Sequence, residues 1–88
     1  MIPPTPHPLV LVEWLDAHTV DPWTSFDDLM DHDTMECETV GWLLKEDDKS
    51  VVVVPHRTTV LGESQGSGVI EIPRGCVTRV YRLMDPRT

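Results

Sequence analysis

Residues 37–55 read CETVGWLLKEDDKSVVVVP, and this stretch decides the fold. Residues 37–46 alternate between two faces with the period of a β-strand: one face holds Val40, Trp42 and Leu44, and the other holds Cys37, Thr39, Gly41 and Leu43. Residues 47–49 predict a turn, and residues 50–54 predict a second strand because valine fits a pleated sheet. Pro55 has no backbone N–H and ends that strand. The stretch therefore predicts a β-hairpin.

Further strands are predicted on both sides of this hairpin. Residues 9–15 form a strand that is apolar on both faces, so we expect it to be buried on both faces or to lie at an interface. Residues 56–61 predict a bent or edge strand, and residues 62–68 a flexible loop. Strands over 69–72 and 76–83 flank a tight turn at 73–75. Short strands at this close spacing predict a mainly β protein built as a small five-stranded barrel.

The remaining segments are an arm and a helix. Residues 1–8 hold four of the eight prolines, which favours an extended arm, either loose or laid on a neighbouring subunit. Between the first two strands, Trp23, Phe26 and Met30 recur at helical spacing, and Thr24 or Ser25 fits the N-cap. We therefore predict a helix of two to three turns near residues 22–32, within a single domain (1–88) whose barrel spans residues 9–84.

The net charge of −8 is distributed unevenly along the chain. Residues 1–48 carry twelve acids and one base, whereas residues 49–88 carry six bases and three acids. General binding to DNA or RNA needs a basic field, so this balance excludes it. A small anionic ligand held by two or three arginines is still allowed. The chain shows no signal peptide and no apolar run long enough to cross a membrane, so we expect it in a cytoplasm, with Cys37 and Cys76 reduced.

No motif for catalysis or for a cofactor is present. The chain lacks the dinucleotide, Walker, zincin and C-x-x-C signatures, and the glycine-rich residues 62–68 have no following lysine and helix. The spacing of His18, His32, Asp33 and Cys37 matches no recognised metal site. We therefore predict a protein that is not an enzyme and that uses neither a cofactor nor a metal.

Candidate ligand-binding residues combine arginines, aromatic rings and hydroxyls. Arg74, in the predicted turn, and Arg57, after the valine strand, have the fork that matches phosphate oxygens. Trp14 and Trp42 lie within strand patterns, so we expect them in the core. Trp23 lies outside any strand, so it either packs the helix onto the barrel or offers a ring on which a base stacks; Tyr81 is a second ring. Thr39 and Thr58 are candidate donors to a sugar or base. For each arginine, surface solubility or pairing with the acidic half is the alternative.

Two segments resemble the Sm-like barrels. Gly41, Leu43 and Asp47 are similar to the first Sm signature, and Arg74-Gly75 is similar to the arginine-glycine pair between the last two strands of that family. The chain has no asparagine, the residue with which Sm proteins contact bases, and Pro73 interrupts the second signature. The end of the chain, Ile72-Pro73 followed by Val77, also resembles an SH3 domain. These likenesses imply an SH3-like or Sm-like barrel.

Over roughly residues 9–83 the chain also resembles small proteins encoded by bacteriophages. The likeness rests on residues 14–17, Trp23, residues 37–41 and residues 70–73. Small phage proteins include inhibitors of bacterial defence, some of which are oligomeric sponges for nucleotide immune signals. The resemblance implies such an anti-defence role in the host cytoplasm.

Three functions follow, in order of preference. The first is a non-enzymatic homo-oligomer that binds and sequesters a small anionic ligand, with a cyclic or modified nucleotide as the expected class. The second is a protein–protein inhibitor whose acidic face mimics nucleic acid and covers a basic surface of a host protein; its residues are Asp27, Asp28, Asp31, Asp33 and Glu36. The third is Sm-type RNA binding, which the charge and the missing asparagine disfavour.

Overall fold

A computed structural model of the chain describes residues 2–17, 19, 23–31 and 33–87. Its strands are β1 (Leu9–Asp16), β2 (Met35–Glu46), β3 (Ser50–Val54), β4 (His56–Thr58), β5 (Gln65–Ser67), β6 (Ile70–Pro73) and β7 (Val77–Arg82). One helix, α1 (Phe26–Leu29), lies between β1 and β2, and a 3₁₀ turn, Arg74–Cys76, lies between β6 and β7. None of the described helices is both long and apolar enough to cross a membrane.

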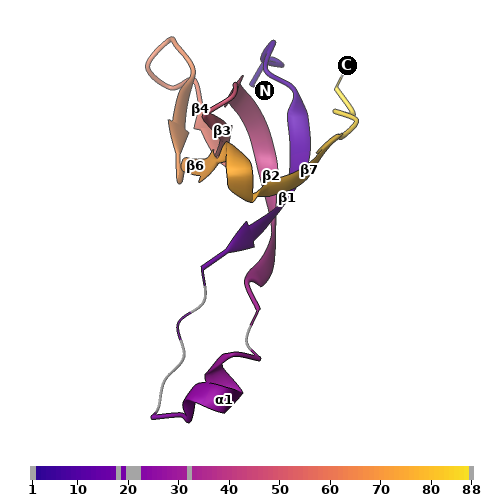
Figure 1. Cartoon of the computed structure of the whole chain (residues 1–88). Coiled ribbons are helices and arrows are strands. Elements are labelled where there is room, and N and C mark those ends of the chain that lie inside the picture. The colour runs from indigo at the N-terminus through magenta and orange to yellow at the C-terminus, as the bar shows by residue number, and fades with distance from the viewer. Residues whose placement is uncertain (1, 18, 20–22, 32, 88) are drawn as a thin grey trace.

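The fold is mainly β, as predicted. Five strands form one antiparallel sheet in the order β6-β3-β2-β1-β7, and β4 and β5 form a separate two-stranded sheet (Figure 1). The expected closed barrel is not formed, because β6 and β7 lie at opposite edges of the sheet and do not pair. β6 has only four residues and ends at Pro73, which lacks the N–H needed to continue pairing, and the 3₁₀ turn then leads the chain to the other edge.

One face of the five-stranded sheet carries the hydrophobic core. Val10 and Val12 of β1, Val51 and Val53 of β3, and Ile72 of β6 are at most 1% exposed. Residues two apart on a strand share a face, so the alternation in β1 and β3 places these side chains together. Burial of each such side chain stabilises the fold by about 1.5–3 kcal/mol. Trp14 packs against this core, as predicted, together with Leu43, Ile70, Cys76, Val77 and Val80.

Gly41 allows β2 to lie close to β3. A Cβ atom on Gly41 would stand 2.5 Å from the carbonyl oxygen of Val54 and 2.8 Å from Cγ1 of Val53. No positive φ is found at this glycine, so it is the missing side chain and not backbone freedom that the position requires. Gly41 lies opposite Val10 across the β1–β2 pairing, so close packing here supports the centre of the core.

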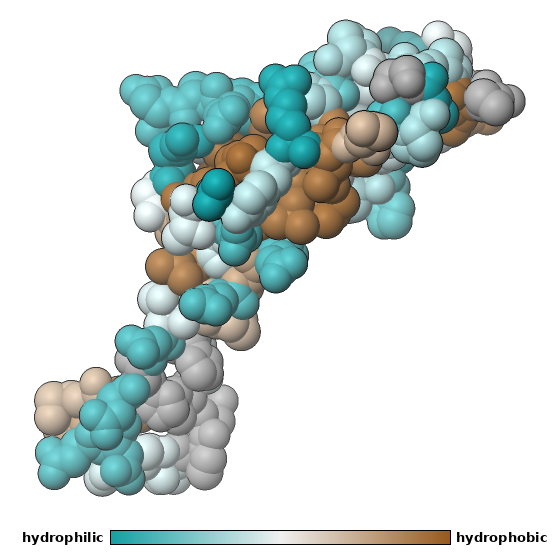
Figure 2. Space-filling model, turned by 90° about the vertical axis from the view of Figure 1, so that its right-hand side faces the viewer, coloured by the Kyte–Doolittle hydropathy of each residue, from teal (hydrophilic) through white to brown (hydrophobic). Residues whose placement is uncertain are grey.

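The pairing of β1 with β2 continues beyond the rest of the sheet. β7 pairs with β1 only as far as Trp14, whereas β2 pairs with it to Asp16. The described residues of the segment 15–36, which we call the extension, thus project from the rest of the chain, which we call the body (Figure 1). The molecule measures 55 × 24 × 23 Å, and α1 lies at the far end of the extension. Figure 2 shows the apolar surface gathered over the body and mostly hydrophilic side chains over the extension.

The helix is shorter than predicted. It spans Phe26–Leu29, a single turn, instead of two to three turns, and residues 22 and 32 at the ends of the predicted helix lie outside the described residues. Ser25 is the N-cap, and its hydroxyl accepts a hydrogen bond from the Asp28 N–H at 3.3 Å. Short helices depend on packing of an apolar face, and here Phe26 and Met30 are exposed, so nothing in the body stabilises further turns.

For residues 56–68 one prediction was confirmed in part and the other was wrong: a strand does begin at His56, but it is shorter than expected. The expected strand over 56–61 ends at Thr58, and the expected loop at 62–68 contains β5. The chain reverses between β4 and β5, with Gly62 at a φ of +88° that glycine adopts readily. Because this hairpin has its own pairing, it forms a small sheet beside the end of β3 instead of extending the main one.

We predict that Gly41→Ala destabilises the protein by about 1–3 kcal/mol, because the added methyl group overpacks the β2–β3 contact. Urea unfolding of the two proteins measures the difference. Gly75→Ala is the matched control, since no atom lies within 4 Å of the Cβ position there. Equal stabilities of the two alanine variants would contradict this account of Gly41.

Candidate ligand-binding site

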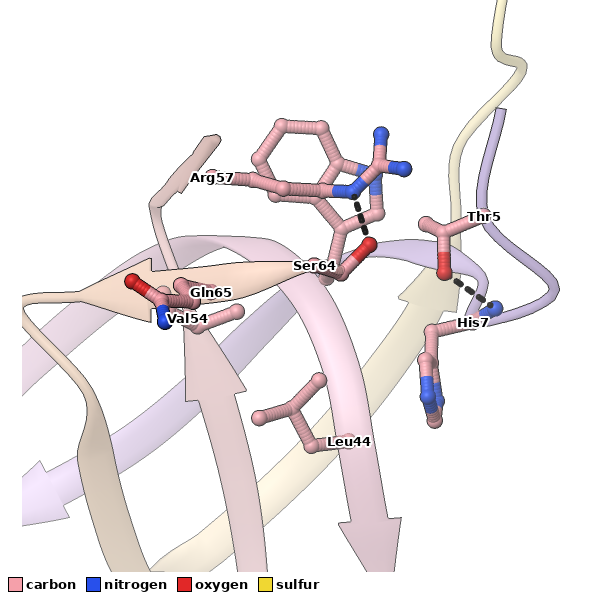
Figure 3. A pocket seen from close by; sticks show the side chains of 9 residues that line it. Thr5, His7, Leu44, Val54, Arg57, Ser64 and Gln65 are labelled. Atoms are coloured by element: carbon pink, nitrogen blue, oxygen red, sulfur yellow. Dashed lines mark hydrogen bonds between the residues drawn. The ribbon is translucent and has the colours of Figure 1, made fainter. Parts of the chain in front are cut away.

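A pocket of about 260 Å³ lies where the N-terminal segment meets β2, β3 and the β4–β5 hairpin. We call it the arm pocket, and the segment 2–8 the arm. Thr5 and His7 line it from the arm, on the side opposite Ser64 and Arg57 (Figure 3). The arm was predicted to be loose or laid on a neighbouring subunit; in the structure it lies against its own body.

The floor of the arm pocket is apolar. It is made by Trp42 and Leu44 of β2 and by Val54 of β3. Trp42 and Val54 are directly opposite in the β2–β3 pairing, so they share one face of the sheet, the face opposite the core. Trp42 was predicted to be a core residue, and it is instead half-buried on this outer face. A Cβ on Gly66 would stand 2.5 Å from Cγ2 of Val54, so only glycine lets the hairpin lie this close to the floor.

Arg57 provides the positive charge of the arm pocket. Its Nε donates to the Ser64 hydroxyl at 3.2 Å, and its Nη1 donates to the Pro3 carbonyl oxygen at 2.8 Å. Both acceptors are neutral, and no described carboxylate lies within ion-pair distance of this guanidinium. A guanidinium has five N–H donors, so these two bonds leave donors for another acceptor. The chain thus places a fixed cation beside an apolar floor; the Asp85 carboxylate interacts with this charge electrostatically but forms no ion pair with it.

Backbone carbonyls hold the arm against the body. The Leu43 N–H donates to the Pro8 carbonyl at 2.8 Å, and Arg87 donates to the Ile2 carbonyl at 3.1 Å. Arg87 is itself fixed by Asp85, at 2.8 Å between Nη2 and Oδ2. The side-chain hydrogen bond from Arg87 lowers the pKa of Asp85 from 3.8 to about 2, and its backbone N–H adds to this effect. Both ends of the chain therefore meet at the arm.

Three of the other predicted ligand residues, Arg74, Tyr81 and Trp23, lie apart from the arm pocket. Arg74 pairs with Glu46 at 2.8 Å, which is the alternative that the sequence left open. Arg79 lies over the Tyr81 ring, 4.7 Å from its centroid, and the hydrogen bond between Tyr81 and the Glu13 carboxylate raises the pKa of the phenol. Trp23 is fully exposed on the extension, so the hypothesis that it packs the helix onto the barrel was wrong.

Of the two threonines, only Thr58 lies near Arg57. Thr58 follows Arg57 on β4, and its hydroxyl accepts from the Val60 N–H at 3.3 Å. The Thr39 hydroxyl accepts a hydrogen bond from Trp14 Nε1 at 3.0 Å on the core side of the sheet. The six predicted residues therefore do not form one site, and Arg57 is the only one of them that lines the arm pocket.

Sequence reasoning missed most of the arm pocket. His7, Trp42, Ser64 and Gln65 were not candidates, because the first was assigned to the arm, the second to the core and the others to a loop. The sequence places Trp42 and Gly41 on opposite faces of one strand, but only the pairing of Gly41 with Val10 shows that the Gly41 face is the core face. No sequence signal identifies Ser64, because its contact with Arg57 exists only once β4 and β5 pair.

The acidic residues predicted to bind a partner lie outside the arm pocket. The described acids Asp27, Asp28, Asp31, Asp33 and Glu36 all lie exposed on the extension. Cys37 and Cys76 are free thiols. Among the described residues, which exclude His18 and His32, no three His, Cys, Asp or Glu side chains are grouped so that they would hold a metal ion.

We predict that Thr39→Val destabilises the protein by about 1–3 kcal/mol, because the half-buried indole N–H of Trp14 loses its acceptor. Thermal or urea unfolding measures the change. Thr58→Val, on the exposed side of β4, is the control and should change stability less. If Thr39→Val left stability unaltered, the structural role assigned to this hydroxyl would be wrong.

We also predict an acid-sensitive contribution from Asp85. Its folded pKa lies below its ordinary value, so the ionised form stabilises the folded state above pH 3.8, and this contribution is lost as the pH falls through about 2. The difference in unfolding free energy between wild type and Asp85→Asn should therefore be constant above pH 3.8 and shrink below it. Urea titrations at a series of pH values test this; a difference that grows on acidification would refute it.

Comparison with known proteins adds no relative to this picture. The chain matches no protein-family model, no curated protein and no solved structure at a significant level. Its function is therefore inferred from the chemistry of its own residues.

Proposed function

We propose that this protein binds a small anionic ligand in the arm pocket and does not turn it over. The observation that carries the proposal is the state of Arg57: its described hydrogen bonds go to a hydroxyl and a carbonyl, not to a carboxylate. The Arg74 and Arg87 guanidiniums are paired with acids at 2.8 Å, so they have less to offer an anion. A charged ligand group would complete the environment of Arg57.

The lining favours a ligand with an anionic group and a planar apolar part. The Trp42 ring and the Leu44 and Val54 side chains suit a base or other flat ring, while Thr5, Ser64 and Gln65 offer polar groups that fix orientation. A volume of about 260 Å³ is just below the range of about 300–1,000 Å³ typical of ligand pockets. We therefore infer a ligand no larger than a mononucleotide, with cyclic or modified mononucleotides as the first class.

Binding without catalysis fits the contacts of the pocket residues. The hydroxyl of Ser64, a candidate nucleophile, accepts from Arg57, and no described hydrogen bond joins it to His7. A nucleophile needs an adjacent base to be activated. Sequestration of a nucleotide immune signal, which the resemblance to small phage proteins implies, needs only affinity and exclusion of water.

We also infer that the sheet is an opened form of an SH3-like or Sm-like barrel. Two features support this: the first strand lies between the second and the last, and a 3₁₀ turn that carries Arg74-Gly75 joins the last two strands. The homo-oligomer stays a prediction; the half-buried Leu9 and Leu11, on the outer face of β1, are the surface it would use.

The test is the melting temperature of the protein with a panel of nucleoside monophosphates, 3′,5′-cyclic nucleotides, uncharged nucleosides and inorganic phosphate. We expect a charged nucleotide to raise the melting temperature; ligand at 100 times Kd stabilises by about 2.7 kcal/mol. The matching nucleoside should have a much smaller effect, because it lacks the group that Arg57 binds.

Arg57→Met keeps the length of the side chain and removes its charge, and we expect it to weaken binding at least about tenfold, as loss of a charge-assisted hydrogen bond does. Arg82→Met, an exposed position on β7 outside the arm pocket, is the matched control and should bind like wild type. The proposal fails if no anion in the panel shifts the wild-type melting temperature at millimolar concentration, or if Arg57→Met and wild type shift equally.

A further inference from the structure

The far end of the extension carries large apolar side chains in full contact with solvent. Within residues 23–31, which we call the head, Trp23 is 104% exposed, Phe26 83% and Met30 76%. Phe26 and Met30 are four residues apart around the single turn of α1, so they lie on the same side of it. Burial of each would gain about 1.5–3 kcal/mol that the isolated chain forgoes. Tryptophan in particular is enriched among the residues that dominate binding at protein interfaces.

The fold itself keeps these side chains away from the core. Past Trp14, β1 pairs with β2 alone, and the two strands carry the head away from the other three strands of the sheet (Figure 1). The single turn is still specified locally: the Ser25 hydroxyl caps it, and the Leu29 and Met30 N–H groups donate to the Ser25 and Phe26 carbonyls at 3.0 Å. The apolar side chains are therefore displayed on a local structure without partners in the body.

The charge of the extension decides what kind of surface would cover the head. Residues 15–36 contain seven aspartates and glutamates and no lysine or arginine, a net charge of −7, so the rest of the chain carries only −1. Nucleic acids and anionic membranes are repelled by such a surface. The head of a second copy is repelled as well, and the body of a second copy, with its charge of −1, offers no complementary field.

We propose that the head docks into an apolar groove with a lysine- and arginine-rich rim on another protein. Trp23, Phe26 and Met30 enter the groove, and the flanking Asp27, Asp28 and Asp31 face the basic rim. This is the mode in which a short helix presents spaced apolar anchors to a groove, with charge adding orientation and association rate. It is distinct from mimicry of nucleic acid by acids alone, because the apolar anchors supply most of the affinity. The surface is separate from the arm pocket and does not depend on ligand binding there.

The partner is captured first with a photo-crosslinking residue. Phe26→p-benzoylphenylalanine places the reactive ketone on the head with little change in shape, and Val60→p-benzoylphenylalanine places it on an equally exposed site, 80%, on the body. Both full-length proteins are irradiated in the cells that naturally contain the chain, and products specific to Phe26 are identified by mass spectrometry. Capture alone does not support the proposal, so the captured protein is purified and titrated against defined variants.

The titrations separate the apolar from the charged contribution. We expect the captured protein to be basic, and we expect Trp23→Ala to raise the Kd of its complex with this chain at least tenfold. Asp27→Asn, Asp28→Asn and Asp31→Asn combined should raise Kd and flatten its dependence on sodium chloride, because these charges face the rim. Val60→Ser, which removes an exposed apolar side chain from the body, is the control and should leave Kd unchanged.

Several outcomes would overturn the proposal. These are a Phe26 product that is a second copy of this chain, a lipid or an acidic protein; no product beyond those of the Val60 position; and a captured protein that binds Trp23→Ala as tightly as wild type. Circular dichroism of each variant shows that its sheet is intact, so a loss of binding reports on the head. Nucleotide-induced melting shifts of the head variants should match wild type, which keeps this proposal distinguishable from that of the arm pocket.

Discussion

The antiparallel pairing of β1 with β2 is the constraint on which the rest of the structure depends. Its register joins Leu9 to Trp42 and Asp16 to Met35 without a shift, so each face of the two strands is set over their whole length. Val10 and Val12 are thereby directed to the core, while Leu9 and Trp42 are directed to the opposite face, where the arm pocket forms. A slip of one residue would exchange the two faces and remove both the core and the pocket floor. The same pairing continues beyond the end of β7 and forms the part of the extension that adjoins the body.

The distribution of charge matches the division of the structure into extension and body better than it matches a division of the sequence into two halves. A division at residue 48 gives an acidic half and a basic half, yet β2 and β3, on either side of that point, are neighbours in one sheet. The structural division is between the extension, at −7, and the body, which is close to neutral. A near-neutral body removes the objection that the total of −8 raises against an anionic ligand at Arg57. Most of the net negative charge, and the repulsion between like charges, therefore lies on the extension, which projects from the body.

The sequence predicts those parts of the fold in which the pattern of neighbouring residues is compatible with only one secondary structure. The alternation in residues 37–46 and the valine run ended by Pro55 locate β2 and β3, because period-two burial and a missing N–H act within the strand itself. The β4–β5 hairpin was missed because Gln65, Gly66 and Ser67 have little preference for sheet, and their pairing depends on the reversal that includes Gly62. The helix was overestimated because its spacing implies a core to pack against, and the extension provides none.

The candidate site was less predictable than the fold, for a related reason. Arg57 was identified from its charge alone, but whether an arginine forms an ion pair depends on residues brought near it by the fold. Glu46 pairs with Arg74, whereas no described carboxylate forms an ion pair with Arg57 and Asp85 acts on it only at longer range. The arm and β4, which contribute residues to the arm pocket, also lie at the opposite end of the molecule from α1, with the paired strands between them (Figure 1). Substitutions at sites that share no partners act additively. The two proposed surfaces share no described contact, so we expect substitutions at one to leave the other undisturbed.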